Sequence, residues 1–455
     1  MNALRLSQVA ERLEGELVGD DISFSSVSTD TRTLTEQALF VALKGPHFNG
    51  HDFIPQAISA GACALLVSEE RLEPMPQIRV DNTHLGLGRL AALWRDSFPV
   101  PLVGITGSNG KTTVKELVAA ILHQRGEVLA TLGNLNNDIG LPLTLLRLQD
   151  EAYAVVEMGA NHPGEIGYLT HIARPDVAVI TNAGAAHLEG FGDLQGVARA
   201  KGEILGGLAP DGVAVLNADD DFFSYWCGLL GERRLISFGS SSRAHVRGDL
   251  DRAQTRWSEN GYHSAMQVNY RESAFEVELA LVGRHNLMNA LAAIAAALAM
   301  GCSIEQIQRG LASVQPVAGR LRSLQSASGL RLIDDTYNAN PDSVAAAMAV
   351  LQQAPGDHWL VLGDLAELGE EAENLHVEIG RHAKAAGLPH LYTLGKLSRR
   401  AAKAFGEGGE AFERIEDLVS VLKERAASGD TLLIKGSRSA GMERVVKLLM
   451  GGEEA

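Results

Sequence analysis

Short apolar runs alternate with amphipathic stretches along most of the chain, and this pattern predicts an α/β protein. Short apolar runs bounded by polar turns are typical of buried strands in a parallel sheet, and the stretches between them have helical spacing. The predicted strands are 22–27, 38–43, 62–67, 102–105, 154–158, 177–181, 213–217, 235–238, 330–333, 358–362, 391–394 and 431–434. The predicted helices are 6–13, 52–60, 85–98, 114–124, 165–172, 194–205, 286–300, 343–353, 371–386, 397–404, 415–427 and 440–450.

The chain of 455 residues is too long for one hydrophobic core, and its loops predict three domains. Polar and proline-containing segments near residue 82 and at 314–316 place the boundaries, giving domains 1–82, 83–313 and 314–455. The first is a small α/β domain, the second a doubly wound, mostly parallel sheet, and the third a Rossmann-like α/β domain. Residues 243–278 are more typical of antiparallel strands and predict an inserted sheet.

Composition narrows the class of protein. Hydrophobic residues make up 45% of the chain, yet no stretch reaches the roughly 18 apolar residues of a membrane span, so we expect a cytoplasmic protein. We also expect it to be a monomer. The three cysteines, Cys63, Cys227 and Cys302, are far apart in sequence, which fits a reducing compartment. A net charge of −16 without a basic block argues against nucleic acid as a partner.

The stretch 103–113 predicts a phosphate-binding loop between a buried strand and a helix. Lys111 would reach the β- and γ-phosphates of ATP, and the Thr112 hydroxyl would hold a bridging Mg²⁺. The strict pattern has Gly where this chain has Ile105. The predicted nucleotide contacts of the loop are Thr106, Gly107, Ser108, Asn109, Gly110, Lys111, Thr112 and Thr113.

Three further polar residues follow strands of the same predicted sheet. Glu157 ends one strand and His187 follows the next, and a carboxylate with an imidazole can complete a magnesium site. The alternatives are a buried, satisfied carboxylate and a hydrogen-bonded loop histidine. Lys201, judged by its helix alone, is an ordinary solvent-facing lysine.

Several polar loops are candidates for binding the rest of a substrate. The loop residues Ser28, Thr29, Asp30 and Arg32, and Lys44, Asn49, Gly50 and His51, have the hydroxyls and cations that suit a diphosphate or sugar, although both loops could be plain surface turns. Asn134, Asn136 and Asn137 could hydrogen-bond a polar ligand or only stabilise their own loop. Asn286 and Asn289 share one helix face and could contact adenine or ribose, or cap the helix. The last domain lacks a G-x-G-x-x-G motif, so a nicotinamide cofactor is unsupported.

Five motifs together resemble those of the Mur ligase family. They are T-G-S-N-G-K-T-T at 106–113, E-M-G-A-N at 157–161, T-N-x-x-x-A-H-L-E at 181–189, H-N-L-M-N-A at 285–290 and D-D-T-Y-N-A-N-P at 334–341. With the loops at 30–32 and 435–438, the resemblance covers essentially the whole chain. Within the family, the loops are most similar to those of members that add D-Ala-D-Ala to a UDP-N-acetylmuramoyl-tripeptide.

The resemblance implies an ATP-dependent ligase with an N-terminal UDP-binding domain, a central ATPase domain and a C-terminal domain that brings the dipeptide. It implies that Lys111, Glu157, His187, Lys201 and Arg320 are catalytic, and that Thr112, Glu157, His187 and a carbamylated Lys201 serve the magnesium site. Asn286 and Asn289 would lie near the adenosine, Arg320 near the γ-phosphate and Asp335 at the ribose. Tyr337, Asn338 and Asn340 would bind substrate together with the two N-terminal loops and the loop of Asn134, Asn136 and Asn137, called the asparagine loop below.

Three other functions compete with this expectation. A phosphate-loop hydrolase or motor would not need the N-terminal loops or the last domain. A nucleotide-binding scaffold would bind ATP without turnover. Another amide ligase of the same fold, such as a folylpolyglutamate synthetase, would add a single amino acid instead of a dipeptide.

Overall fold

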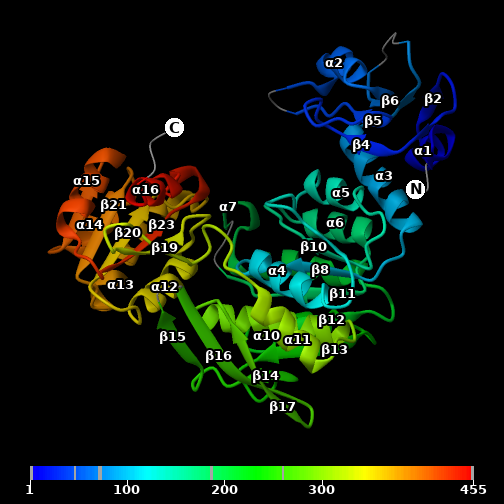
Figure 1. The fold of residues 1–455 in the computed structure, drawn as a ribbon. Coiled ribbons are helices and arrows are strands. Elements are labelled where there is room, and N and C mark those ends of the chain that lie inside the picture. Colours follow the sequence, from blue (N-terminus) through cyan, green and yellow to red (C-terminus); the bar gives the residue numbers. More distant parts are fainter. Residues whose placement is uncertain (1–3, 46–47, 70–73, 185–187, 259–260, 452–455) are drawn as a thin grey trace.

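Three main sheets follow one another along the chain. The computed structural model describes residues 4–45, 48–69, 74–184, 188–258 and 261–451. The N-terminal part, in blue, and the C-terminal part, in yellow, orange and red, lie on either side above the central part (Figure 1). Among the described residues, no helix combines the length and apolar character that crossing a bilayer requires.

The N-terminal part is built on a five-stranded sheet of order β2-β7-β6-β5-β4. Its strands pair in parallel except β2, which is antiparallel to β7. A small ribbon of β1 and β3 lies beside it. The elements are β1 (Leu4–Arg5), α1 (Leu6–Leu13), β2 (Glu16–Val18), β3 (Ser23–Phe24), β4 (Ser26–Ser28), β5 (Ala38–Val41), η1 (Gly50–Phe53), α2 (Ile54–Ser59), β6 (Ala62–Val67) and β7 (Gln77–Arg79).

The central sheet has ten strands in the order β15-β16-β14-β13-β12-β11-β8-β10-β9, with β17 also paired to β16. Strand β8, which leads into the phosphate loop, lies between β10 and β11, so the carboxyl ends of these three strands meet at one edge. The strands are β8 (Leu102–Thr106), β9 (Val128–Ala130), β10 (Tyr153–Glu157), β11 (Val177–Ile180), β12 (Val213–Asn217), β13 (Arg234–Gly239), β14 (Val246–Gly248), β15 (Gln254–Ser258), β16 (Gly261–Tyr270) and β17 (Ser273–Leu279).

The antiparallel strands do not form the separate inserted sheet that the sequence predicts. Strand β14 pairs in parallel with β13 and antiparallel with β16, so β14 to β17 extend the central sheet at one edge. The tip of this extension reaches the C-terminal part, where Tyr262 packs into that part's core and Trp257 packs against it.

Helices cover both faces of the central sheet. On one face, α4, α10 and α11 share a core with the sheet. The helices of this part are α3 (Thr83–Ser97), α4 (Lys111–Leu122), α5 (Gly140–Leu145), α6 (Glu165–Ala173), α7 (Leu188–Phe191), α8 (Leu194–Gly202), η2 (Glu203–Gly207), α9 (Phe223–Gly228), α10 (Arg284–Ala299) and α11 (Ile304–Ser313).

Helix α3 joins the N-terminal part to the central part. One continuous core contains Leu39 and Leu66 of the N-terminal sheet, Leu87 and Leu90 of α3, and Ile166 of α6. The apolar side chains of α3 therefore pack against both parts at once, whereas the C-terminal part has its own cores.

The C-terminal part is a six-stranded sheet of order β18-β19-β23-β20-β21-β22, parallel except for β18. Its helices also cover both faces. The elements are β18 (Arg322–Gln325), β19 (Arg331–Asp335), α12 (Pro341–Leu351), β20 (His358–Gly363), η3 (Gly369–Glu371), α13 (Ala372–Ala385), β21 (His390–Leu394), α14 (Arg399–Phe405), β22 (Gly409–Phe412), α15 (Ile415–Arg425), β23 (Thr431–Lys435), η4 (Arg438–Ala440) and α16 (Glu443–Leu449).

Candidate active site

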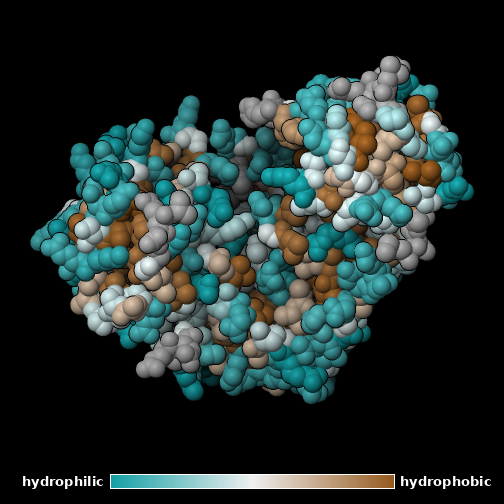
Figure 2. Space-filling model, turned by 45° about the horizontal axis from the view of Figure 1, so that its top comes forward, coloured by the Kyte–Doolittle hydropathy of each residue, from teal (hydrophilic) through white to brown (hydrophobic). Residues whose placement is uncertain are grey.

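A cleft of about 600 Å³ lies between the phosphate loop and the C-terminal part. Figure 2 shows the surface hollowed between the outer parts of the molecule. From the central part the cleft is lined by Ser108 to Thr113, Asn134, Asn136, Asn137, Glu157, His285, Asn286 and Asn289, and from the C-terminal part by Arg320, Asp335, Tyr337, Asn338, Asn340 and Lys435. Most of the predicted nucleotide residues are thus brought to one place.

The phosphate loop turns from β8 into α4 through two glycines that have no room for a side chain. Gly110, at φ +84°, precedes the helix, and a Cβ added there would lie 2.1 Å from Asn289 Oδ1. A Cβ added at Gly107 would lie 1.9 Å from Thr181 Oγ1. The loop is therefore packed closely against the neighbouring strand and helix, with the start of α4 facing the cleft. Thr106 is fully buried and donates to the Met158 carbonyl, so it supports the loop from below.

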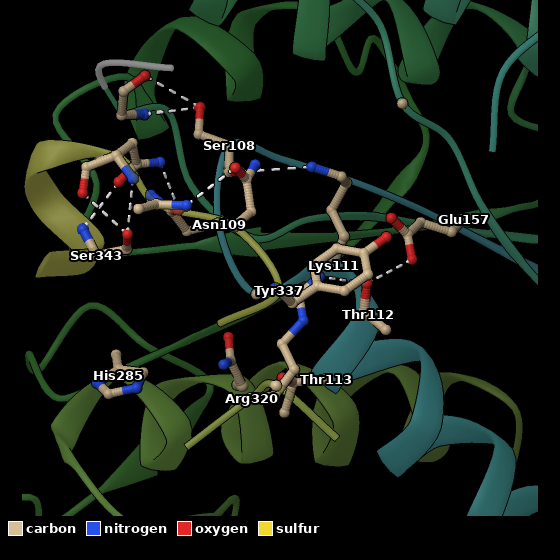
Figure 3. Close-up of a pocket in the computed structure, with 18 of the residues that line it drawn as sticks. Ser108, Asn109, Lys111, Thr112, Thr113, Glu157, His285, Arg320, Tyr337 and Ser343 are labelled. Carbon is tan, nitrogen blue, oxygen red and sulfur yellow. Dashed lines mark hydrogen bonds between the residues drawn. The ribbon is translucent and has the colours of Figure 1, made fainter. Parts of the chain in front are cut away.

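Lys111 folds back over this loop (Figure 3). Its Nζ donates to the carbonyls of Gly107 at 2.7 Å and Ser108 at 3.4 Å. Burial lowers the pKa of Lys111; the nearby Glu157 carboxylate opposes this shift, and Arg320 adds to it. An anion in the loop would supply the opposite charge that this ammonium needs.

Glu157 and Thr112 meet at the carboxyl edge of the sheet. Strand register places Glu157 beside Ile105, immediately before the loop. Glu157 Oε2 accepts from Thr112 Oγ1 at 2.9 Å, and Oε1 accepts from Asn136 Nδ2 at 2.8 Å. The side chain is buried and satisfied, yet it borders the cleft.

Hard oxygen donors of this kind fit Mg²⁺. Within the described ranges, no group of three or more His, Cys, Asp or Glu residues is placed to hold a metal. The Thr112 hydroxyl and the Glu157 carboxylate are the donors that the structure brings together, and His187 lies outside the described residues.

Lys201 is buried on α8, with 1% of its surface exposed, so the interpretation as a solvent-facing lysine is wrong. Burial, with a smaller contribution from the charge of Lys111, lowers its pKa to about 7. Its Nζ lies 5.2 Å from the centre of the Phe191 ring, and no hydrogen bond or ion pair joins it to another described residue. The lysine is not among the residues that line the cleft.

Asn286 and Asn289 lie on the first turns of α10 and are held by one another. Asn289 Nδ2 donates to Asn286 Oδ1 at 3.1 Å, and Asn286 Nδ2 donates to the Val282 carbonyl at 2.9 Å. The residue that caps α10 is Gly283, so neither asparagine acts as the helix cap.

The C-terminal part contributes a guanidinium that reaches the phosphate loop. Arg320 Nη2 donates to Thr112 Oγ1 at 3.2 Å, and its guanidinium carbon lies 4.2 Å from the centre of the Tyr337 ring. Tyr337 therefore supports Arg320 from one face, as Figure 3 shows. Arg320 Nε is buried without a partner among the described residues.

Lys435 and His285 are titratable residues of the cleft that were not predicted as site residues. Lys435, at the end of β23, lies beside Asp335 of β19 and donates to its Oδ2 at 2.5 Å and to the Asn338 carbonyl at 3.0 Å. A lysine at the end of an apolar strand indicates that it has a buried partner of opposite charge. The sequence does not show which residue this is, because Asp335 is 100 residues away. His285 also lines the cleft, and burial lowers its pKa to about 4, so it is neutral near pH 7.

Asn134, Asn136 and Asn137 of the asparagine loop border the cleft. Asn136 contacts Glu157, and Asn137 Oδ1 accepts from the Gly140 amide at the start of α5. The backbone carbonyl of Asn134 accepts from the Asn136 amide. This loop therefore stabilises itself and also supplies a contact to the Glu157 carboxylate.

The N-terminal candidates are not among the residues that line this cleft. The Arg32 side chain pairs with Asp30 and holds the pKa of that carboxyl at about 2, and Ser28 Oγ donates to the Asp30 carbonyl. Thr29 follows β4 and is half-buried.

In the second N-terminal loop, Lys44 Nζ lies 3.2 Å from Glu69 Oε1. Asn49 caps η1 by accepting from the His51 amide, and His51 and Gly50 are buried. His51 Nε2 accepts from the Ser68 amide, so this histidine holds the loop in place.

Comparisons with known proteins agree with this arrangement. Residues 23–95 match the model of the Mur ligase family catalytic domain, residues 105–297 the Mur ligase middle domain, and residues 319–438 the Mur ligase glutamate ligase domain. The UDP-N-acetylmuramoyl-tripeptide–D-alanyl-D-alanine ligase of Escherichia coli (strain K12) is 46% identical over 452 residues, which are 99% of each chain.

Solved structures of MurF are also similar. MurF from Acinetobacter baumannii has a TM-score of 0.92 at 34% identity, with 99% of each chain covered. MurF ligase from Thermotoga maritima in complex with ADP has a TM-score of 0.84 at 30% identity, with 94% of this chain and 97% of that chain covered. With three family models in order along the chain and full-length relatives in sequence and structure, the chain belongs to the Mur ligase family.

Proposed function

We propose that this protein is an ATP-dependent ligase that joins D-Ala-D-Ala to the terminal carboxylate of a UDP-N-acetylmuramoyl-tripeptide during peptidoglycan precursor synthesis. The observation that carries the proposal is the double contact of the Thr112 hydroxyl, with Glu157 of the central part and Arg320 of the C-terminal part. A phosphate loop completed by a second domain suits a ligase better than a simple hydrolase, and the full-length relatives bear the ligase name.

The reaction needs activation because a carboxylate is a poor electrophile. The tripeptide carboxylate attacks the γ-phosphate of ATP, ADP leaves, and an acyl phosphate forms. The dipeptide amine then attacks the acyl carbon and phosphate is expelled. Lys111 and Arg320 neutralise the charge of the transferring phosphoryl group, which is the main task in such transfers.

Thr112 and Glu157 are the groups that would hold Mg²⁺, together with His187. The ion would supply further positive charge at the phosphates. A positively charged Lys201 would repel the Mg²⁺ ion. A carbamate on Lys201 would replace this positive charge with a negative one. A lysine with a pKa of about 7 has a large neutral fraction near neutral pH, and the neutral amine is the form that adds CO₂.

The remaining roles extend the same proposal. Asn286 and Asn289 contact the adenosine and Asp335 the ribose. Tyr337, Asn338 and the asparagine loop face the acceptor and dipeptide. The N-terminal loops around Asp30 and Lys44 hold the UDP end, and the enzyme acts as a monomer in the cytoplasm.

A substrate screen tests the function. ADP release is measured with ATP and UDP-N-acetylmuramoyl-tripeptide in the presence of D-Ala-D-Ala or of single amino acids, and the product mass is determined. We expect turnover only with D-Ala-D-Ala, and a product that is heavier than the tripeptide substrate by two alanine residues. Turnover with ATP alone would indicate a hydrolase, and a product with one added amino acid would indicate another ligase of this fold.

A further inference from the structure

The start of α12 in the C-terminal part lies directly against the phosphate loop (Figure 3). Asn340 Nδ2 donates to Asn109 Oδ1 at 2.8 Å. Close by, a Cβ added at Gly184 would lie 2.8 Å from Asp342 Oδ2. Gly184 is itself tied to the loop, because its amide donates to Ser108 Oγ at 2.9 Å. The first residues of α12 thus contact both the phosphate loop and the neighbouring segment at Gly184.

The amide group of Asn340 already has protein partners at both ends. Its Oδ1 accepts from the Ser343 amide at 2.8 Å and caps α12, while its Nδ2 crosses to Asn109. Its backbone amide donates to Ser343 Oγ at 3.0 Å. A side chain used in this way holds two elements in register, which differs from the substrate contact that the sequence predicts for Asn340.

Asn109 is a fixed point on the other side of the contact. Its backbone carbonyl accepts from Thr181 Oγ1 at 2.6 Å and from Asn182 Nδ2 at 3.1 Å, and its amide donates to Asn182 Oδ1 at 3.0 Å. The backbone of Asn109 is therefore anchored to the central sheet, and its side chain is free to reach the C-terminal part. When the C-terminal part moves, it therefore moves against a section of the phosphate loop that is held rigidly by the central sheet.

We propose that Asn340 is a positioning residue that sets, through Asn109, where the C-terminal part docks on the phosphate loop. Docking at this place brings Arg320 to within 3.2 Å of Thr112, where it meets the transferring phosphoryl group. The catalytic consequence rests on the proposed ligase function, whereas the docking itself does not.

The variant Asn340→Ser separates the two uses of this side chain. Serine still caps a helix but is too short to reach Asn109. We expect an unchanged melting temperature and a kcat at least about tenfold lower, because displacement of a positioning group by about 1 Å can cost up to 10²-fold. Asn109→Ala should have a similar effect, and the double variant should be no slower than the slower single variant.

Asn82→Ser is the matched control, because the Asn82 side chain only caps α3. The kcat of this variant should equal that of the wild type.

Several results would overturn the proposal. An unchanged kcat in Asn340→Ser would do so, as would effects of the two single variants that simply multiply in the double variant. A higher KM for D-Ala-D-Ala with the same kcat would instead assign Asn340 to dipeptide binding.

Small-angle scattering of the substrate-free proteins tests docking independently of ligation. Asn340→Ser and Asn109→Ala should both have a larger radius of gyration than wild type and Asn82→Ser, and equal radii would refute docking through this contact. If the radii change but the wild type forms no amide bond, the docking role stands and the proposed ligase function fails.

Discussion

At the scale of single residues, Lys111 is the cation that the phosphate loop itself supplies. It has no carboxylate partner within hydrogen-bonding distance among the described residues and donates only to loop carbonyls. Lys111→Ala should therefore leave the fold intact and lower kcat by about 10²–10³-fold, the usual loss when one donor to a developing charge is removed. Steady-state kinetics and a melting curve check this. A variant that retains more than about a tenth of the wild-type rate would show that another group carries the charge.

Lys201 is the residue at which burial and charge conflict most clearly. An ammonium enclosed near Lys111 is costly, and a carbamate would remove the conflict. Lys201→Ala should be nearly inactive, and acetate should partly restore its activity by supplying the missing anion. The matched control is Arg199→Ala on the same helix, because the Arg199 side chain is exposed and only pairs with Asp193 across 3.8 Å.

Two measurements decide the role of Lys201. Intact-protein mass spectrometry under CO₂ should show an added carbamate on the wild type and none on Lys201→Ala. If Lys201→Ala is as active as the wild type, the lysine has no part in the reaction.

At the scale of elements, the start of α4 depends on a backbone shape that only glycine adopts without strain. Gly110→Ala would place a methyl group against Asn289 at a φ of +84°. We expect this variant to lose most of its ATP affinity and about 1–3 kcal/mol of stability. Gly228→Ala is the control, because a Cβ at this helical position meets nothing within 4 Å. Calorimetric titration with an ATP analogue measures the first effect and urea unfolding the second, and an unchanged affinity in Gly110→Ala would contradict the close packing of the loop.

The sequence predicts buried elements well because burial leaves a continuous apolar pattern. Strand β12 spans 213–217, as predicted, since parallel strands covered on both faces are apolar throughout. Short strands such as β7, β9 and β22 were not predicted, because three or four residues carry too little pattern. The attachment of β14 to β13 also depends on pairing that no local pattern encodes.

The same limit applies to the site. The phosphate loop and Glu157 could be predicted because motif residues directly follow apolar strands. The pairing of Lys435 with Asp335 and the burial of Lys201 depend on which strands and helices become neighbours, and a single sequence does not state this. The contact of Asn340 with Asn109 joins two domains and is equally hidden.

At the scale of the whole molecule, the cores indicate which parts move together. The N-terminal and central parts share one core through α3, and Trp94 and Arg95 of this helix donate to the carbonyls of Leu148 and Ala173. The C-terminal part has two cores of its own, into which the central part contributes only Tyr262 and Val282 among the described buried residues, and it also meets the phosphate loop. The C-terminal part is therefore the one best able to rotate.

We expect the molecule to close over its substrates, because the acyl phosphate of the proposed reaction must be protected from water and because ATP and the dipeptide would bind to different domains. Small-angle scattering should show a smaller radius of gyration when an ATP analogue and the UDP-linked substrate are added. Hydrogen exchange in α3 should stay unchanged, since the core around it does not open. No compaction would contradict closure, and faster exchange in α3 would show that the N-terminal part moves as well. Substrates would shift the molecule further toward the docked arrangement of this structure, in which Arg320 lies 3.2 Å from Thr112 on a phosphate loop that the central sheet holds still.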